Sequence, residues 1–132
     1  LKLCIEEAII AVHDGVRPLI HPDLILNLYH QAELNSAVIP VCPILESIRK
    51  AQGGGSKALD RSQYYSVQTP QCFSSDLLQN AYQHDEQETF TDDASVVEAL
   101  GKNVQLFKGE RTNIKLTTPE DFVFAEALLN RP

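Results

Sequence analysis

Two charged side chains, Asp14 and Arg17, directly follow a short apolar run and are the first candidates for chemistry. The run, residues 8–12, is typical of a strand buried on both faces of a parallel sheet. In open α/β sheets, ligands bind beyond the carboxyl ends of the strands. An aspartate there could hold a metal ion or a ligand hydroxyl, and an arginine could hold a phosphate through its planar guanidinium. Residue type alone leaves open a structural ion pair that closes the loop.

Lys115 is a second candidate because of the segment that contains it. It is the one cation in residues 113–118, directly before Thr118 and Pro119, which are typical of a helix start. The N-terminus of a helix favours anions, so an ammonium group beside it indicates an anion site. A solvated surface lysine is the alternative.

Two polar segments supply further hydroxyl and carboxyl groups. Residues 68–71 (Gln-Thr-Pro-Gln) precede a helix start at Ser74 or Ser75, and a turn is the simplest interpretation. Residues 91–95 (Thr-Asp-Asp-Ala-Ser) are typical of a helix N-terminus, with Thr91 as the N-cap. Their paired carboxylates could also hold Mg²⁺, although no further ligands follow at metal spacing.

Composition argues against several classes of function. A net charge of −7, from 11 Lys+Arg against 18 Asp+Glu, disfavours non-specific binding to nucleic acid. No apolar run approaches the roughly 18–20 residues that span a bilayer, so we expect no membrane partner. Three cysteines without a CxxC pair indicate a reducing cytoplasm and neither a disulfide framework nor a zinc site. No glycine-rich phosphate loop follows a strand.

The apolar periodicity predicts an α/β protein. Residues 22–34 have helical spacing and lie between strand-like runs at 8–12 and 37–41, an order typical of a βαβ unit. A further strand is expected over residues 104–108, and the last helix begins after Thr118. The predicted inner face of that helix comprises Phe122, Ala125, Leu128 and Leu129.

Three successive glycines, residues 53–55, predict a turn, because their backbone entropy is too costly inside a helix or strand. The mixed polar and apolar stretches on either side favour a β-hairpin arm projecting from the body at about 47–67. Arg61 lies on the returning side of this arm, where residue type alone predicts a surface position.

Four motifs in order resemble those of the 2-C-methyl-D-erythritol 4-phosphate cytidylyltransferase family. Each is weak alone, but together, at compatible spacing, they are highly specific and cover nearly the whole chain. They are residues 12–18 (Val-His-Asp-Gly-Val-Arg-Pro), residues 60–62 (Asp-Arg-Ser) with 68–73 (Gln-Thr-Pro-Gln-Cys-Phe), residues 91–95, and residues 113–121 (Asn-Ile-Lys-Leu-Thr-Thr-Pro-Glu-Asp).

The resemblance implies a Rossmann-like three-layer nucleotidyltransferase fold with a projecting β-hairpin arm. It also implies a cytoplasmic homodimer joined through that arm, with no nucleic-acid or membrane partner. The implied reaction converts CTP and methylerythritol phosphate to the CDP-alcohol and pyrophosphate in non-mevalonate isoprenoid biosynthesis, with Mg²⁺ as cofactor.

The resemblance assigns roles by matched position. Lys115 would be catalytic and would stabilise the pentacovalent charge. Asp14 would contact substrate or ribose hydroxyls, or the metal ion, and Arg17 would support the substrate pocket. Thr69 and Thr91 would donate or accept hydrogen bonds with the substrate.

Two assigned residues lie on the arm. Arg61 would hold the methylerythritol phosphate in the partner's site. Ser47 would bind substrate through its hydroxyl, although Glu46-Ser47 stands where the family usually has Asp-Thr. A second departure is Gly15-Val16 in place of the usual small pair, where Val16 could narrow the pocket.

The matched region, residues 1–132, corresponds to the C-terminal portion of the family's single domain. The chain begins at Leu1 rather than Met, and the family's N-terminal CTP-binding loop has no counterpart here. We therefore expect a piece of a longer protein that is inactive alone. Two alternatives stay open: a cytidylyltransferase for a pentitol phosphate such as ribitol phosphate, and a non-catalytic dimerisation module.

Overall fold

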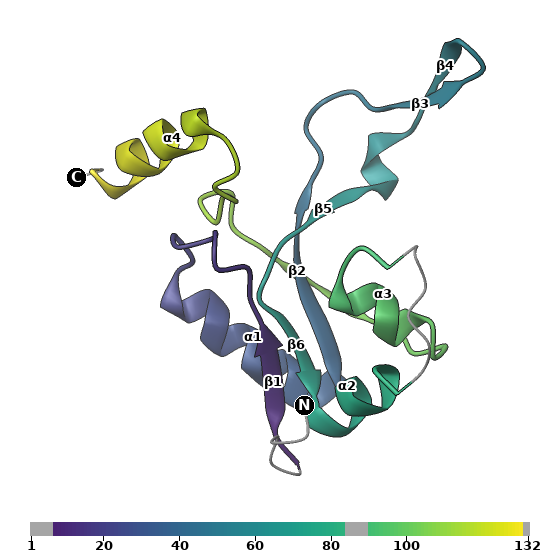
Figure 1. Cartoon of the computed structure of the whole chain (residues 1–132), viewed down its shortest axis with the longest axis vertical. Coiled ribbons are helices and arrows are strands. Elements are labelled where there is room, and N and C mark those ends of the chain that lie inside the picture. Colours follow the sequence, from purple (N-terminus) through teal and green to yellow (C-terminus); the bar gives the residue numbers. More distant parts are fainter. Residues whose placement is uncertain (1–6, 84–89, 131–132) are drawn as a thin grey trace.

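A five-stranded sheet forms the centre of the computed structural model, which describes residues 7–83 and 90–130 (Figure 1). Strand β2 (Ala37–Pro43) lies in its middle. On one side β2 pairs in parallel with β7 (Gln105–Lys108), and it pairs antiparallel with both β5 (Tyr65–Val67) and β6 (Gln71–Ser74). Strand β1 (Ile9–Val12) pairs antiparallel with β6.

The first strand differs from the expectation of a fully buried parallel strand. All four residues of β1 are half-buried, and its neighbour β6 runs in the opposite direction. Because β1 and β2 are both antiparallel to β6, they are parallel to each other, with β6 between them. The βαβ unit is therefore present, but its two strands are not adjacent. A short apolar run does not specify its pairing partner, which is why the periodicity misjudged this strand.

Helix α1 (Pro22–Asn35) covers one face of the sheet. Leu24, Leu28 and Ala32 are buried at helical spacing and form a cluster with Val38 and Cys72 of the sheet. The helix begins where Pro22 suits the first turn, and it ends at Ser36, whose φ of +63° is left-handed. The predicted helix over residues 22–34 is confirmed.

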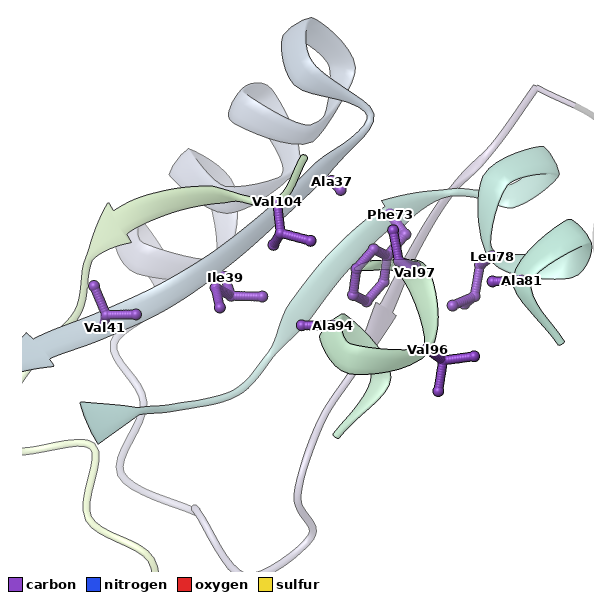
Figure 2. Packing of buried hydrophobic residues seen from close by; sticks show 10 residues of the cluster. All are labelled: Ala37, Ile39, Val41, Phe73, Leu78, Ala81, Ala94, Val96, Val97 and Val104. Atoms are coloured by element: carbon purple, nitrogen blue, oxygen red, sulfur yellow. The ribbon is translucent and has the colours of Figure 1, made fainter. Parts of the chain in front are cut away.

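Helices α2 (Ser75–Ala81) and α3 (Asp93–Glu98) cover the other face. Phe73 and the alternate β2 residues Ala37, Ile39 and Val41 point toward them and form the larger core cluster (Figure 2). Since β2 is buried on both faces, the order is helix, sheet, helices, as the predicted three-layer fold requires. The N-cap of α3 is Asp92 and not Thr91, because the Asp92 carboxylate accepts from the Ser95 amide.

The predicted hairpin is confirmed as a separate two-stranded sheet that projects from the body (Figure 1). Strand β3 (Arg49–Gln52) pairs with β4 (Gly55–Ala58), and every residue of both strands is exposed. Gly53 and Gly54 have φ values of +48° and +87°, which explains glycine at the tip. A short 3₁₀ helix, η1 (Arg61–Gln63), leads the chain back to β5.

Helix α4 (Pro119–Leu129) begins as predicted, with Thr118 and Asp121 forming a capping box. Its predicted inner face is wrong for Phe122 and Leu129, which are 63% and 72% exposed, whereas Ala125 is buried. The apolar pattern identified residues suited to burial, but the described part of the chain does not cover Phe122 and Leu129. No helix within the described ranges has the length and apolarity needed to cross a membrane.

Candidate active site

Chain segments far apart in the sequence meet at one cleft beyond the end of β1. Val12, the last residue of β1, lies opposite Gln71, the first of β6, so the loop leaving β1 meets the turn that enters β6. The loop after β7 and the N-terminus of α3 complete the walls. The cleft has a volume of about 380 Å³, and its lining includes Asp14, Arg17, Thr69, Thr91 and Lys115.

Asp14 joins the two cations of the cleft. Its Oδ2 atom lies 3.1 Å from Arg17 Nε and 3.2 Å from Lys115 Nζ. Burial raises the pKa of Asp14, but the hydrogen bonds from Arg17 and Lys115 outweigh it, so the pKa lies below its ordinary value. At neutral pH the carboxylate is charged and holds the Lys115 ammonium at the cleft wall.

Arg17 is the most buried member of this group, with 11% of its side chain exposed. Besides Asp14, it contacts the loop that carries Lys115, because its Nη1 donates to the Asn113 carbonyl at 2.8 Å. The Leu116 amide donates to the Val16 carbonyl at 2.8 Å and joins the same two loops. One planar guanidinium thus orients both Asp14 and the lysine loop, so Arg17 acts here through its neighbours.

Thr69 lies in the break between β5 and β6, where the Thr69–Pro70 peptide is cis. Its Oγ1 accepts from the Asp14 amide at 2.9 Å and lies 2.9 Å from His13 Nδ1. Asn113 Nδ2 donates to the Thr69 carbonyl at 2.9 Å. Asp14 therefore contacts both Thr69 and Lys115 directly, and two side chains without a role assigned from the sequence, His13 and Asn113, also contact Thr69.

Gln68 is a further residue that sequence reasoning missed. It is buried, its Nε2 donates to the Glu110 carbonyl at 2.8 Å, and its Oε1 accepts from the Glu110 amide at 3.1 Å. This two-point contact fixes the loop after β7. A Cβ atom on Gly109 would lie 2.4 Å from Gln68 Oε1 and 3.2 Å from the Val41 carbonyl oxygen, so a side chain here would displace the Gln68 amide. Glutamine is usually exposed, so the residue type did not indicate a buried role. The signal that could have identified Gln68 is its position in residues 68–73, one of the motifs that match the family.

The wall of the cleft at the N-terminus of α3 is acidic. The Asp92 carboxylate caps α3 and also accepts from Gln71 Nε2 at 2.9 Å, while Gln71 Oε1 accepts from the Ala94 amide at 2.9 Å. Thr91 lies exposed at this wall, and its amide donates to Ser95 Oγ at 3.2 Å. The cleft thus presents both cationic and acidic side chains to a ligand.

The two arm residues are not brought to this cleft. Ser47 and Arg61 are exposed, and neither is among the residues that line the described cleft. Arg61 Nη1 donates to the Leu45 carbonyl, two residues before the arm. The expectation that both side chains reach a partner's site stays a prediction.

The Asp14 carboxylate could bind a metal ion whose other ligands come mainly from the substrate. Both neighbouring cations contact Oδ2, so a metal ion would have to use Oδ1. Among the residues the structure describes, no group of three or more His, Cys, Asp or Glu could form a complete metal site. Mg²⁺ commonly binds one or two carboxylates together with substrate phosphates, and a single Asp14 ligand fits that pattern.

Comparison with known proteins decides the family. The family model described as IspD, 2-C-methyl-D-erythritol 4-phosphate cytidylyltransferase, matches residues 2–131. The chain belongs to this family. A cytidylyltransferase of that name from Phocaeicola vulgatus is 48% identical over 123 residues, which is 93% of this chain and 56% of the relative.

Solved structures agree with this membership. The 2-C-methyl-D-erythritol 4-phosphate cytidylyltransferase of Thermus thermophilus superposes with a TM-score of 0.82 at 34% identity, over 93% of this chain and 62% of that one. The enzyme of that name from Francisella tularensis gives 0.84 at 28% identity, over 96% and 62%. The chain thus has the cytidylyltransferase fold, and it spans a little over half the length of the curated relative from P. vulgatus.

Proposed function

We propose that the full-length protein transfers the cytidylyl group of CTP to 2-C-methyl-D-erythritol 4-phosphate and releases pyrophosphate, as a step of non-mevalonate isoprenoid biosynthesis. Family membership supports this assignment. The observation that carries it is the contact of Asp14 Oδ2 with Arg17 and Lys115 inside the cleft. A cationic group held beside a polar cleft suits the transfer of a phosphoryl-type group.

In the proposed reaction, a phosphate oxygen of the polyol phosphate attacks the α-phosphorus of CTP. A new P–O bond forms as the bond to the pyrophosphate leaving group breaks. The chemistry depends on positioning and on neutralising charge that spreads over the equatorial oxygens. Lys115 is the proposed catalytic residue, because its side chain is 46% exposed while Asp14 fixes the direction of its ammonium.

The other cleft residues take binding roles in this proposal. Arg17 holds Asp14 and the 113–116 loop in place, and the hydroxyls of Thr69 and Thr91 face the polyol. Mg²⁺, when bound, would neutralise phosphate charge, with Asp14 as its protein ligand. A cytoplasmic location is also proposed, which the free buried thiols of Cys42 and Cys72 support.

The arm supports a proposed homodimer. All of β3 and β4 are exposed and lie away from the body, so they are accessible to a second copy (Figure 1). We propose that Arg61 binds the substrate phosphate in the partner's cleft through its planar guanidinium, with Ser47 beside it. The cleft of each protomer would then be completed by the other.

The test is pyrophosphate release by the full-length protein with CTP and each of two polyol phosphates. Methylerythritol phosphate should be the preferred substrate. Preference for ribitol phosphate would move the assignment to a pentitol-phosphate cytidylyltransferase, and no release with either would refute the catalytic proposal and leave the dimerisation module.

A further inference from the structure

The neighbours of the Thr69 hydroxyl determine which hydrogen bond it donates and which it accepts. The Asp14 backbone N–H can only donate, so it occupies one lone pair of Thr69 Oγ1 at 2.9 Å. The second neighbour is His13 Nδ1, also at 2.9 Å. The direction of that second bond depends on which ring nitrogen of His13 carries the proton.

The other ring nitrogen of His13 settles this direction. His13 Nε2 lies 3.1 Å from the Arg17 carbonyl oxygen, which can only accept. In a neutral imidazole the proton therefore lies on Nε2, and Nδ1 is an acceptor. The Thr69 hydroxyl must then donate to His13, which leaves one lone pair of Oγ1 for a ligand.

We propose that His13 is a positioning residue that fixes the polarity of the Thr69 hydroxyl, so that Thr69 accepts a hydrogen bond from a ligand hydroxyl. An oxygen with its hydrogen committed cannot donate to a phosphate oxygen. Thr69 therefore contacts the polyol part of the substrate, and Lys115 is left to the phosphates. The inference rests on the proposed function for the identity of its ligand.

This polarity should contribute to specificity. A site built to pair with a hydroxyl discriminates against a ligand that lacks it, because the partner oxygen is left unpaired. His13 itself is exposed and needs no contact with the ligand for this effect. His30 offers a matched control, since it is also exposed but lies on α1, where its Nδ1 is 3.4 Å from Glu33 Oε2.

The first test needs no activity. In the ¹⁵N-labelled full-length protein, NMR of the His13 imidazole, at a pH where the ring is neutral, should show the proton on Nε2. A proton on Nδ1 would overturn the proposal, because Thr69 would then be free to donate. This result stands whether or not the protein releases pyrophosphate, so it separates this inference from the proposed function.

The second test uses kinetics. His13→Leu should raise the KM for the polyol phosphate about tenfold, with a smaller change in kcat and in the KM for CTP. His13→Asn keeps an acceptor near the Nδ1 position and should recover most of the loss. His13→Gln keeps only the outer position, which faces the Arg17 carbonyl, and should not. His30→Leu should leave the kinetics unchanged.

A double-mutant cycle completes the test. Because His13 acts through Thr69, adding His13→Leu to Thr69→Val should cost little beyond Thr69→Val alone. Additive losses would contradict the proposal, as would recovery by His13→Gln without recovery by His13→Asn.

Discussion

The cleft and the arm position their polar side chains in opposite ways. In the cleft, Asp14 contacts Arg17 and Lys115, and Arg17 also contacts the Asn113 carbonyl, so residues nearly 100 positions apart fix one another. On the arm, Arg61 donates a hydrogen bond to the Leu45 carbonyl and Arg49 donates one to Ser56. Both contacts join residues that are close in the sequence.

The difference shows where the geometry of each region comes from. The cleft is specified by long-range contacts inside this chain, which join the loop after β1 to the loop after β7. The arm is a local hairpin with exposed strands. The contacts of its side chains are therefore set by the molecule that binds to it. The following experiments test that contrast in the full-length protein.

The largest effect is expected for Lys115→Ala. Loss of the cation that faces the transferred group should lower kcat by about 10²–10³-fold, while the melting temperature changes little because Lys115 is 46% exposed. Lys102→Ala, which removes an exposed lysine outside the cleft, is the control. Near-normal turnover in Lys115→Ala would remove this residue from the catalytic role.

Arg61→Ala should raise the KM for the polyol phosphate, without loss of stability, because Arg61 is exposed. Mixing this variant with Lys115→Ala subunits distinguishes the two regions more sharply. If each site takes Lys115 from one protomer and Arg61 from the other, random mixing should restore about a quarter of wild-type activity. Absence of any recovery would place the function of Arg61 within its own chain.

Gly109→Ala should lower the free energy of unfolding by about 1–3 kcal/mol, because its Cβ would lie 2.4 Å from Gln68 Oε1 and 3.2 Å from the Val41 carbonyl. Gly15→Ala is the matched control, since nothing lies within 4 Å of its Cβ. Urea denaturation measures both. Equal stability of the two variants would show that the Gln68 contact does not constrain the cleft.

The smallest effect concerns pH. The pKa of Asp14 is lowered in the folded state, so its contribution to stability is present above the unfolded value of about 3.9 and is lost as pH falls through the folded value. Asp14→Asn should therefore be less stable than wild type at pH 7, and the gap should narrow below about pH 4. A gap that is constant across this range would show that the charge of Asp14 is not what stabilises the loop.

Local patterns predicted much of the fold. Helix α1, the start of α4 at Thr118 and the glycine tip of the hairpin follow from apolar spacing, capping residues and backbone freedom, which depend on neighbours in the sequence. Strand β1 was misjudged, because its pairing direction depends on β6, a strand far along the chain.

The sequence alone determined which residue types stand in which motifs, and those motifs were enough to identify the family and to nominate Asp14, Thr69 and Lys115. Only the tertiary structure decided how these side chains are linked: that Asp14 Oδ2 contacts both cations, and that His13 and Asn113 contact Thr69. The physical reason is the separation in sequence between the residues that make each contact. Helix caps and turns are set by bonds between near neighbours, whereas the cleft exists only where the sheet brings distant loops within hydrogen-bond distance.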